Sequence, residues 1–201
     1  MSIPTPQQFH ERALAHADTE RRLPLPDQSL WDIFPFEPDS LHVKPLDDLV
    51  LPEPPRSGEG GVDCWRCDHP DEGVVWSNER WVLTPLTQAR VPFAVMLMPR
   101  AHLDLGDLDD GMAAELGVLA VRMTRAVEAL ELVGRVHLYK FGDGGAHLHA
   151  FLFGRPAGMV QLRGSCLTLW DEMLPEVPDD ERAAVVAVAL DALADLGEAA
   201  G

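Results

Sequence analysis

The feature that most constrains the fold of this chain is a change of hydrophobic pattern along its middle half. Three short segments rich in β-branched and aromatic residues come first, separated by turn-forming residues, at 73–77, 80–86 and 93–99. One long segment with helical spacing of apolar residues follows, and then two more strand-like segments at 135–141 and 146–154, joined by the tight sequence GDGG. Strands, one long helix and a closing hairpin predict an α+β fold, an antiparallel sheet with helices packed on it.

The long helical segment covers residues 109–132. Its apolar residues recur at the spacing of one helix face, namely Leu116, Leu119, Ala120, Met123, Val127 and Leu130. Asp109 or Asp110 can cap its N-terminus, and Gly134 lies just beyond its end, so the sequence predicts both boundaries.

Both flanks differ from this middle part. Ten of the 17 prolines fall at or before Pro55, so residues 1–61 are predicted to be an extended arm with one short helix near Pro6–Arg22 and a linker at 51–61. The arm carries the apolar sequence SLWDIFPF, and we expect it to dock on the body, because its large side chains are costly to leave in water: Trp31, Ile33, Phe34 and Phe36.

The rest of the chain divides into a middle domain and a C-terminal extension. We expect the domain at 62–160 and a helical extension at 161–201, with helices at 165–174 and 179–197 and Gly197 as the stop of the second.

The formal net charge of −17 at pH 7 argues against polymeric DNA or RNA as a partner. A small nucleotide is still compatible, because a few local donors can overcome the global field. The start has no signal-peptide pattern, and the longest apolar run, AAVVAVAL, is too short to span a membrane. Three cysteines do not form a secreted disulfide framework, so we expect a soluble cytoplasmic protein.

Two histidines alternate directly after the GDGG turn. On a strand, His147, His149 and Phe151 would share one face, while Leu148 and the residues alternating with it pack on the other. Two imidazoles on one face are able to bind a metal or attack an electrophile. The alternative is a half-exposed strand with two incidental histidines, and the residues alone favour that alternative.

The stretch GDGGAHLHAFLFGRP resembles the signature of the histidine triad (HIT) superfamily. His147 and His149 match its first two histidines, and Arg155 stands where the family often has an arginine. The sequence FAVMLMPRAHLDLGDL also resembles the family's strand and turn, and the similarity covers about residues 62–160. It implies a HIT-like antiparallel sheet with packed helices.

The same resemblance implies a function. The second histidine of the family is its nucleophile, so His149 would attack a phosphorus, form a covalent nucleotidyl-imidazole and pass the nucleotide to water or another acceptor. Backbone amides of the turn at Asp143, Gly144 and Gly145 would face phosphate oxygens, and Lys140 or Arg155 would add charge. The expected substrate is a small nucleotide or nucleoside phosphate, and the expected assembly is a homodimer.

Three departures from the family pattern support a second hypothesis. Phe151 replaces the third histidine, at which the galactose-1-phosphate uridylyltransferase branch has glutamine. Gly144 stands where a serine is usual, and Asp143 beside it repels phosphate. Because each lost donor costs roughly 3 kcal/mol of transition-state stabilisation, the alternative is a HIT-fold nucleotide-binding or regulatory protein without efficient catalysis.

A candidate metal site lies upstream. Cys64 and Cys67, in CWRC, form half of a tetrahedral zinc site. His69 could supply a third ligand, and a disulfide or a free thiol pair is the other interpretation. Some members of the resembled family complete the site with the histidine after Pro-Lys/Arg and the first histidine of the signature, which implies His102 and His147 here.

Four protein ligands would make this Zn²⁺ structural and leave no open position, which argues against zinc-dependent hydrolysis.

The three tryptophans of the domain are all expected in the core: Trp65, Trp76 and Trp81. Trp81 is the best candidate to contact a base.

Overall fold

The computed structural model describes residues 3–19, 22–24 and 53–199. The expected docking patch of the arm lies outside the described residues. Helices occupy Pro6–His16 (α1), Trp65–Asp68 (α2), Asp110–Glu128 (α3), Leu167–Met173 (α4) and Asp179–Asp191 (α5). Short 3-10 turns occupy Glu59–Gly61 (η2), Leu105–Asp107 (η3), Val160–Leu162 (η4) and Gly164–Cys166 (η5). No helix in these ranges is long and apolar enough to cross a bilayer.

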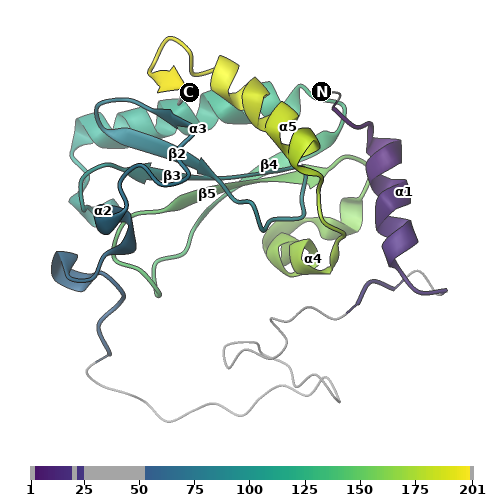
Figure 1. Ribbon diagram of the computed structural model, residues 1–201, viewed down its shortest axis with the longest axis horizontal. Coiled ribbons are helices and arrows are strands. Elements are labelled where there is room, and N and C mark those ends of the chain that lie inside the picture. The colour runs from purple at the N-terminus through teal and green to yellow at the C-terminus, as the bar shows by residue number, and fades with distance from the viewer. Residues whose placement is uncertain (1–2, 20–21, 25–52, 200–201) are drawn as a thin grey trace.

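Six strands form one antiparallel sheet in the order β4-β5-β3-β2-β1-β6. Their bounds are Trp76–Ser77 (β1), Trp81–Pro85 (β2), Phe93–Pro99 (β3), Val133–Lys140 (β4), Ala150–Pro156 (β5) and Glu198–Ala199 (β6). Figure 1 shows α3 and α5 above this sheet, and α2 and α4 below it. The predicted α+β class, with a sheet, a long helix and a closing hairpin, is confirmed.

The core lies between the sheet and α3. Leu119 and Met123 on α3, Leu97 on β3 and Leu152 on β5 have no exposed surface. Asp109 caps α3, with its side chain accepting a hydrogen bond from Met112 N, as one of the two predicted caps. Burial of this apolar face therefore fixes the strands that carry the site.

The predicted stops of two helices are wrong. α3 ends at Glu128 because a turn bonded from Val133 N to Leu130 O follows it, and Gly134 lies inside β4. α5 ends at Asp191, and Gly197 serves a close approach instead. A Cβ at Gly197 would stand 2.4 Å from Ser77 O, so only glycine lets the chain pass there toward β6.

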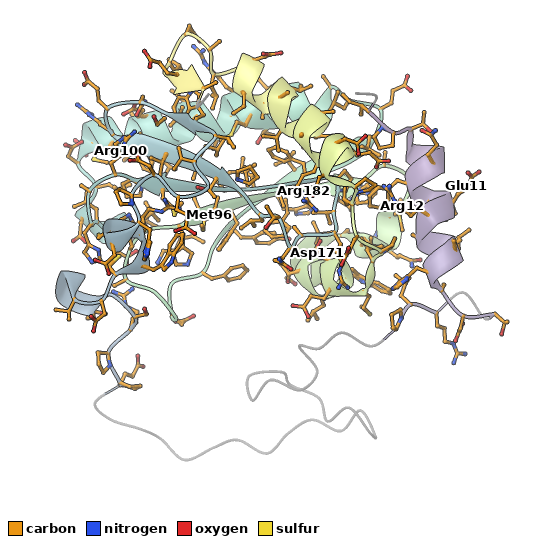
Figure 2. The ribbon with its side chains drawn as sticks, in the orientation of Figure 1. Glu11, Arg12, Met96, Arg100, Asp171 and Arg182 are labelled. Atoms are coloured by element: carbon orange, nitrogen blue, oxygen red, sulfur yellow. The ribbon has the colours of Figure 1, made fainter. Side chains whose placement is uncertain are left out.

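Two buried charged side chains hold the loop between β2 and β3. Asp171 of α4 accepts hydrogen bonds from Arg90 N and Val91 N, both at 2.7 Å. Arg182 of α5 donates to Ala89 O at 3.5 Å. Figure 2 labels both side chains between α4 and α5. The C-terminal helices thereby secure the end of the sheet opposite the histidines.

The strand of the histidines begins later than predicted. The sequence predicts extended structure from residue 146, but β5 starts at Ala150. Leu148 N donates to Leu103 O at 2.8 Å, outside the sheet ladder. The side chain of Leu148 is nevertheless buried, as predicted. His147 and His149 therefore lie in an irregular segment that leads into the strand.

Candidate functional site

Two cysteines and two histidines gather at one end of the sheet. Cys64 is the N-cap residue of α2 and Cys67 lies within this helix, while His102 follows β3 and His147 precedes β5. The ligand atoms of these four residues, here called the metal cluster, all lie within 4.8 Å of one another. His147 Nδ1 is 3.4 Å from Cys64 Sγ and 3.6 Å from Cys67 Sγ, and Cys67 Sγ is 3.5 Å from His102 Nδ1.

These separations fit a tetrahedral zinc ion. Zn–S bonds of about 2.3 Å and Zn–N bonds of about 2.0–2.1 Å place a tetrahedral sulfur and nitrogen about 3.6 Å apart. The three observed S···N distances of 3.4–3.6 Å match that value. Two thiolates and two imidazoles are also a donor set that zinc prefers, so the residues present can hold this metal.

The protonation pattern of His147 suits a metal ligand. Its Nε2 lies 2.8 Å from Pro99 O, and a carbonyl only accepts, so Nε2 carries the proton and the Nδ1 lone pair faces the thiols. Burial lowers the pKa of His147, which keeps the ring neutral at pH 7. Burial, and then the hydrogen bond with Cys64, raise the pKa of the Cys67 thiol to about 11, so metal binding releases protons.

Neither His69 nor a disulfide takes part in this cluster. His69 is outside the cluster, because its Nδ1 bonds to Trp65 O at 3.0 Å and its ring stacks on Trp65. All cysteines are free, so Cys64 and Cys67 form no disulfide. The set implied by the resemblance is the one that the fold brings together.

Polar contacts shape the loop that carries Cys64 and Cys67, residues 57–72, here called the metal loop. Arg66 is only 5% exposed, and its guanidinium donates to three backbone carbonyls of the loop at His69, Pro70 and Glu72. Gly58 has a φ of +76°, and a Cβ there would lie 3.2 Å from Cys64 Cβ. This loop therefore depends on hydrogen bonds and a glycine instead of an apolar core.

His149 has one ring nitrogen committed and one free. Its Nδ1 lies 2.7 Å from His147 O and must donate to that carbonyl, so the neutral ring carries its lone pair on Nε2. Within the described residues Nε2 has no hydrogen-bond partner. Phe151 packs edge-on against this ring at 5.3 Å between centroids, where the resembled family has a polar side chain.

The turn Gly142–Gly145, here called the glycine turn, lies beside His149. A Cβ at Gly145 would stand 3.4 Å from His149 Cε1. Asp143 and Gly144 are exposed. Within the described part of the chain, the amides of Asp143, Gly144 and Gly145 have no hydrogen-bond acceptor. Consecutive free amides next to an imidazole lone pair are a suitable environment for phosphate oxygens.

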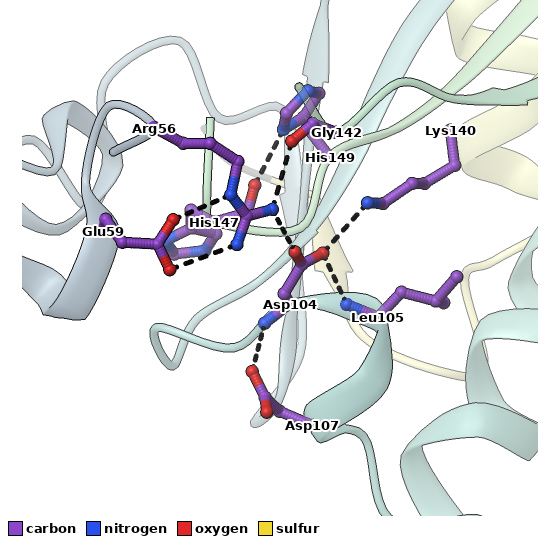
Figure 3. A network of polar contacts seen from close by, with 9 residues as sticks. All are labelled: Arg56, Glu59, Asp104, Leu105, Asp107, Lys140, Gly142, His147 and His149. Carbon is purple, nitrogen blue, oxygen red and sulfur yellow. Dashed lines mark hydrogen bonds and ion pairs between the residues drawn. The ribbon is translucent and has the colours of Figure 1, made fainter. Parts of the chain in front are cut away.

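Asp104 gathers two cations near this turn. Its carboxylate accepts from Arg56 Nη1 at 2.6 Å and pairs with Lys140 Nζ at 3.1 Å, as Figure 3 shows. Partial burial alone would raise the pKa of Asp104, but the hydrogen bonds from Arg56, Leu105 N and Lys140 lower it to about 2. Lys140 therefore lies near the glycine turn, but its positive charge is already paired with the Asp104 carboxylate.

Two predicted substrate contacts lie elsewhere. Arg155 is the sixth residue after His149, which along an extended strand is about 20 Å away. Its Nη1 donates to Pro156 O at 2.8 Å. Trp81 has no exposed surface, so its ring belongs to the core and offers no face to a base. Trp76 is buried as predicted, but Trp65 is 50% exposed.

Sequence reasoning missed three polar residues of this region. Arg56 and Ser57 belong to the segment predicted as a free linker, yet both bond to the glycine turn. Asp104 follows His102 by two residues and was not singled out. The composition of the segment gave no sign of these contacts, because each joins positions more than 40 residues apart in the sequence.

No known protein-family model matches the chain, and no curated protein sequence matches it. The chain is similar to several solved structures of histidine triad proteins. A Zn-bound histidine triad family protein from Mycobacterium smegmatis is 18% identical, with 67% of this chain and 96% of that chain covered and a TM-score of 0.45. A histidine triad protein from Marinobacter aquaeolei is 18% identical over 64% and 93%, with a TM-score of 0.47. One from Bradyrhizobium japonicum is 18% identical over 61% and 92%, with a TM-score of 0.47.

Proposed function

We propose that this protein is a divergent HIT-like nucleotidyl hydrolase or nucleotidyltransferase with His149 as its nucleophile. The observation that carries the proposal is the hydrogen bond from His149 Nδ1 to His147 O at 2.7 Å. It fixes the tautomer in which Nε2 holds the lone pair, and it orients that nitrogen beside the glycine turn.

The reaction proceeds in two displacements. His149 Nε2 attacks the α-phosphorus of a nucleoside phosphate, so a P–N bond forms while the bond from phosphorus to the leaving oxygen breaks. The leaving group departs with the electron pair and takes a proton from solvent. Water or another hydroxyl then attacks the same phosphorus and loses its proton to solvent, while the P–N bond breaks and its electron pair returns to Nε2 as the neutral lone pair. The free amides of Asp143 and Gly145 support charge on the phosphate oxygens.

We assign zinc a structural part. Cys64, Cys67, His102 and His147 would hold it with no open coordination position, so its chemistry is to fix the loop and the first histidine. His147 links both centres, because its ring belongs to the metal cluster and its carbonyl holds His149. A small soluble nucleotide remains the proposed substrate class, in a homodimeric protein.

Native mass spectrometry tests the proposal, at neutral pH because a phosphoramidate is acid-labile. Wild type, His149→Ala and the control His69→Ala are mixed with a panel of nucleoside polyphosphates and nucleoside-phosphate sugars. We expect a mass gain of one nucleotide in wild type and His69→Ala and none in His149→Ala. The same spectra count zinc ions and subunits. Turnover that persists in His149→Ala would overturn the proposal.

A second candidate is a nucleotide-binding or regulatory protein without efficient catalysis. The contact that favours it is the ring of Phe151 against His149, which replaces a polar group beside the phosphorus. Phe151 continues into a row of aromatic rings with Phe141, Phe153 and Tyr139. Nucleotide binding without an adduct or product in any variant, with zinc still bound, would favour this candidate.

A further inference from the structure

The first residue of the metal loop, Ser57, and the residue before it, Arg56, are bonded to the glycine turn. Ser57 N donates to Gly144 O at 3.1 Å, and Ala146 N donates to Ser57 O at 2.9 Å, which forms a parallel β-bridge between Ser57 and Gly145. Arg56 Nη1 donates to Gly142 O at 3.1 Å. Residues far apart in the sequence thus close one side of the turn.

Arg56 is itself fixed by two carboxylates. Its Nε donates to Glu59 at 2.8 Å and its Nη1 donates to Asp104 at 2.6 Å. Figure 3 shows its guanidinium between these two groups, with the carbonyl of Gly142 beside it and His149 nearby. The planar guanidinium can make these contacts at once, whereas an ammonium at the same place holds fewer of them.

The carbonyls of Gly142 and Gly144 are hydrogen-bonded, and this fixes the direction of the N–H group that follows each of them. In a trans peptide the C=O and the next N–H lie in one plane and point in opposite directions. Gly144 O points to Ser57, so the N–H of Gly145 points away from that segment, and Gly142 O orients the N–H of Asp143 in the same manner. These are two of the amides that have no acceptor within the described residues.

We propose that Arg56 and Ser57 are positioning residues of this site, which hold the glycine turn so that its amides receive the substrate phosphate beside His149. This inference rests on the proposed function and names how that site is organised. It also explains how the turn keeps a defined shape although Gly144 replaces a side-chain donor. The same segment continues through Gly58 to Cys64, so the glycine turn and the metal cluster are joined by one short piece of chain.

Three variants of the full-length, zinc-loaded protein test the inference beside wild type. Arg56→Ala removes the side-chain contacts, and Arg56→Lys keeps the charge but not the planar fork. Ser57→Pro removes the N–H that bonds Gly144 O without changing charge. Arg12→Ala is the control, because Arg12 pairs with Glu181 at 2.7 Å at a similar exposure, 23% against 30% for Arg56.

Two readouts are measured by NMR in each protein. The first is hydrogen exchange at the Ala146 amide, and the second is the shift of the Asp143 and Gly145 amides on titration with inorganic phosphate. We expect Arg56→Ala and Ser57→Pro to speed exchange at Ala146 about tenfold and to weaken phosphate binding about tenfold. Arg56→Lys should recover part of both effects, and Arg12→Ala should match wild type.

Unchanged exchange and unchanged phosphate shifts in both Arg56→Ala and Ser57→Pro would overturn the inference. So would weaker phosphate binding in Arg56→Ala alone with no change in exchange, because loss of charge would then explain it. Failure of the proposed function looks different. In that case wild type shows protected Ala146 and phosphate-sensitive amides, but no nucleotide adduct forms on His149.

Discussion

The helix-covered face of the sheet and the metal loop are built by different forces. Between α3 and the sheet, Leu83, Leu97, Leu119 and Leu152 have no exposed surface. In the metal loop only Gly58, Cys64 and Arg66 are buried. The first region is stabilised by apolar burial, the second by hydrogen bonds to backbone carbonyls and by a cluster that fits a metal ion.

This difference separates stability from site geometry. The sheet needs no metal to bury its core, so it should keep its shape when the metal is absent. The metal loop has too few apolar contacts to order itself, and it carries the segment that holds the glycine turn. Events at the metal should therefore be transmitted to the site, while changes in the core should alter global stability.

Removal of the zinc ion proposed at this cluster should give the largest effect. Structural zinc contributes on the order of 10 kcal/mol in small zinc domains, so a chelator should release the metal loop and the glycine turn from protection. Hydrogen exchange measures this, with fast exchange expected in residues 57–72 and 142–148 and slow exchange retained in α3. Cys64→Ser should mimic the chelator.

Cys166→Ser is the matched control, because Cys166 is a free thiol outside the cluster. It should bind one zinc ion and exchange like wild type. Collapse of protection in α3 together with the loop would contradict the comparison between the two regions.

Truncation in the core should give the opposite pattern. Leu119→Ala removes a fully buried side chain between α3 and the sheet and should lower the free energy of unfolding by about 2–5 kcal/mol. The zinc content should remain one ion per chain. Denaturant unfolding with zinc analysis measures both, and Val118→Ala, at a residue 45% exposed, should change stability by less than about 0.5 kcal/mol. Zinc lost from Leu119→Ala below its unfolding transition would contradict independence of the two regions.

The sequence predicted the first region better than the second. Apolar spacing at Leu119, Met123 and Val127 identified α3, and the β-branched segments identified the strands. These signals are local, because the spacing of apolar residues and the residue composition are properties of a single helix or strand. The boundaries at Gly134 and Gly197 were wrong, since these glycines serve a strand and a close approach to Trp76, which local sequence does not reveal.

The candidate site was predictable only where a motif carries it. The spacing of Cys64 and Cys67 and the resemblance at His147 gave the metal cluster. Arg56 was not predicted as a site residue, because its partners Asp104 and Gly142 are distant in the sequence and the residues around it have the composition of a linker. Contacts of this kind become visible only when the topology brings the segments together.

The loop between β2 and β3 should make stability depend on pH. Burial, the largest influence, raises the pKa of Asp171 to about 6, although the amides of Arg90 and Val91 act against it. Because this pKa lies above the unfolded value, the group's contribution is fully present below about pH 4 and is lost as the pH rises through 6. The loss is on the order of 2–3 kcal/mol.

Urea unfolding at pH 4 and pH 7.5 measures this dependence. Asp171→Asn keeps an acceptor for the two amides and removes the titration, so wild type should lose more stability than this variant between the two values. Asp191→Asn, an exposed carboxylate on α5, is the control and should follow wild type. Equal losses in wild type and Asp171→Asn would show that Asp171 does not carry the effect.

The smallest effect is expected at Arg155, and it tells which end of the sheet holds the reaction. Its guanidinium lies near Gly134 and Pro156, at the end of β5 away from the metal cluster. Arg155→Ala should therefore leave nucleotide adduct formation within about twofold of wild type, because charge about 20 Å away in water is screened. Lys140→Ala, which removes one of the two cations paired with Asp104 next to the glycine turn, should slow it more. Rates of adduct formation in the two variants measure the contrast. A large loss in Arg155→Ala with Lys140→Ala unaffected would move the phosphate to the far end of β5, beyond the reach of His149 Nε2.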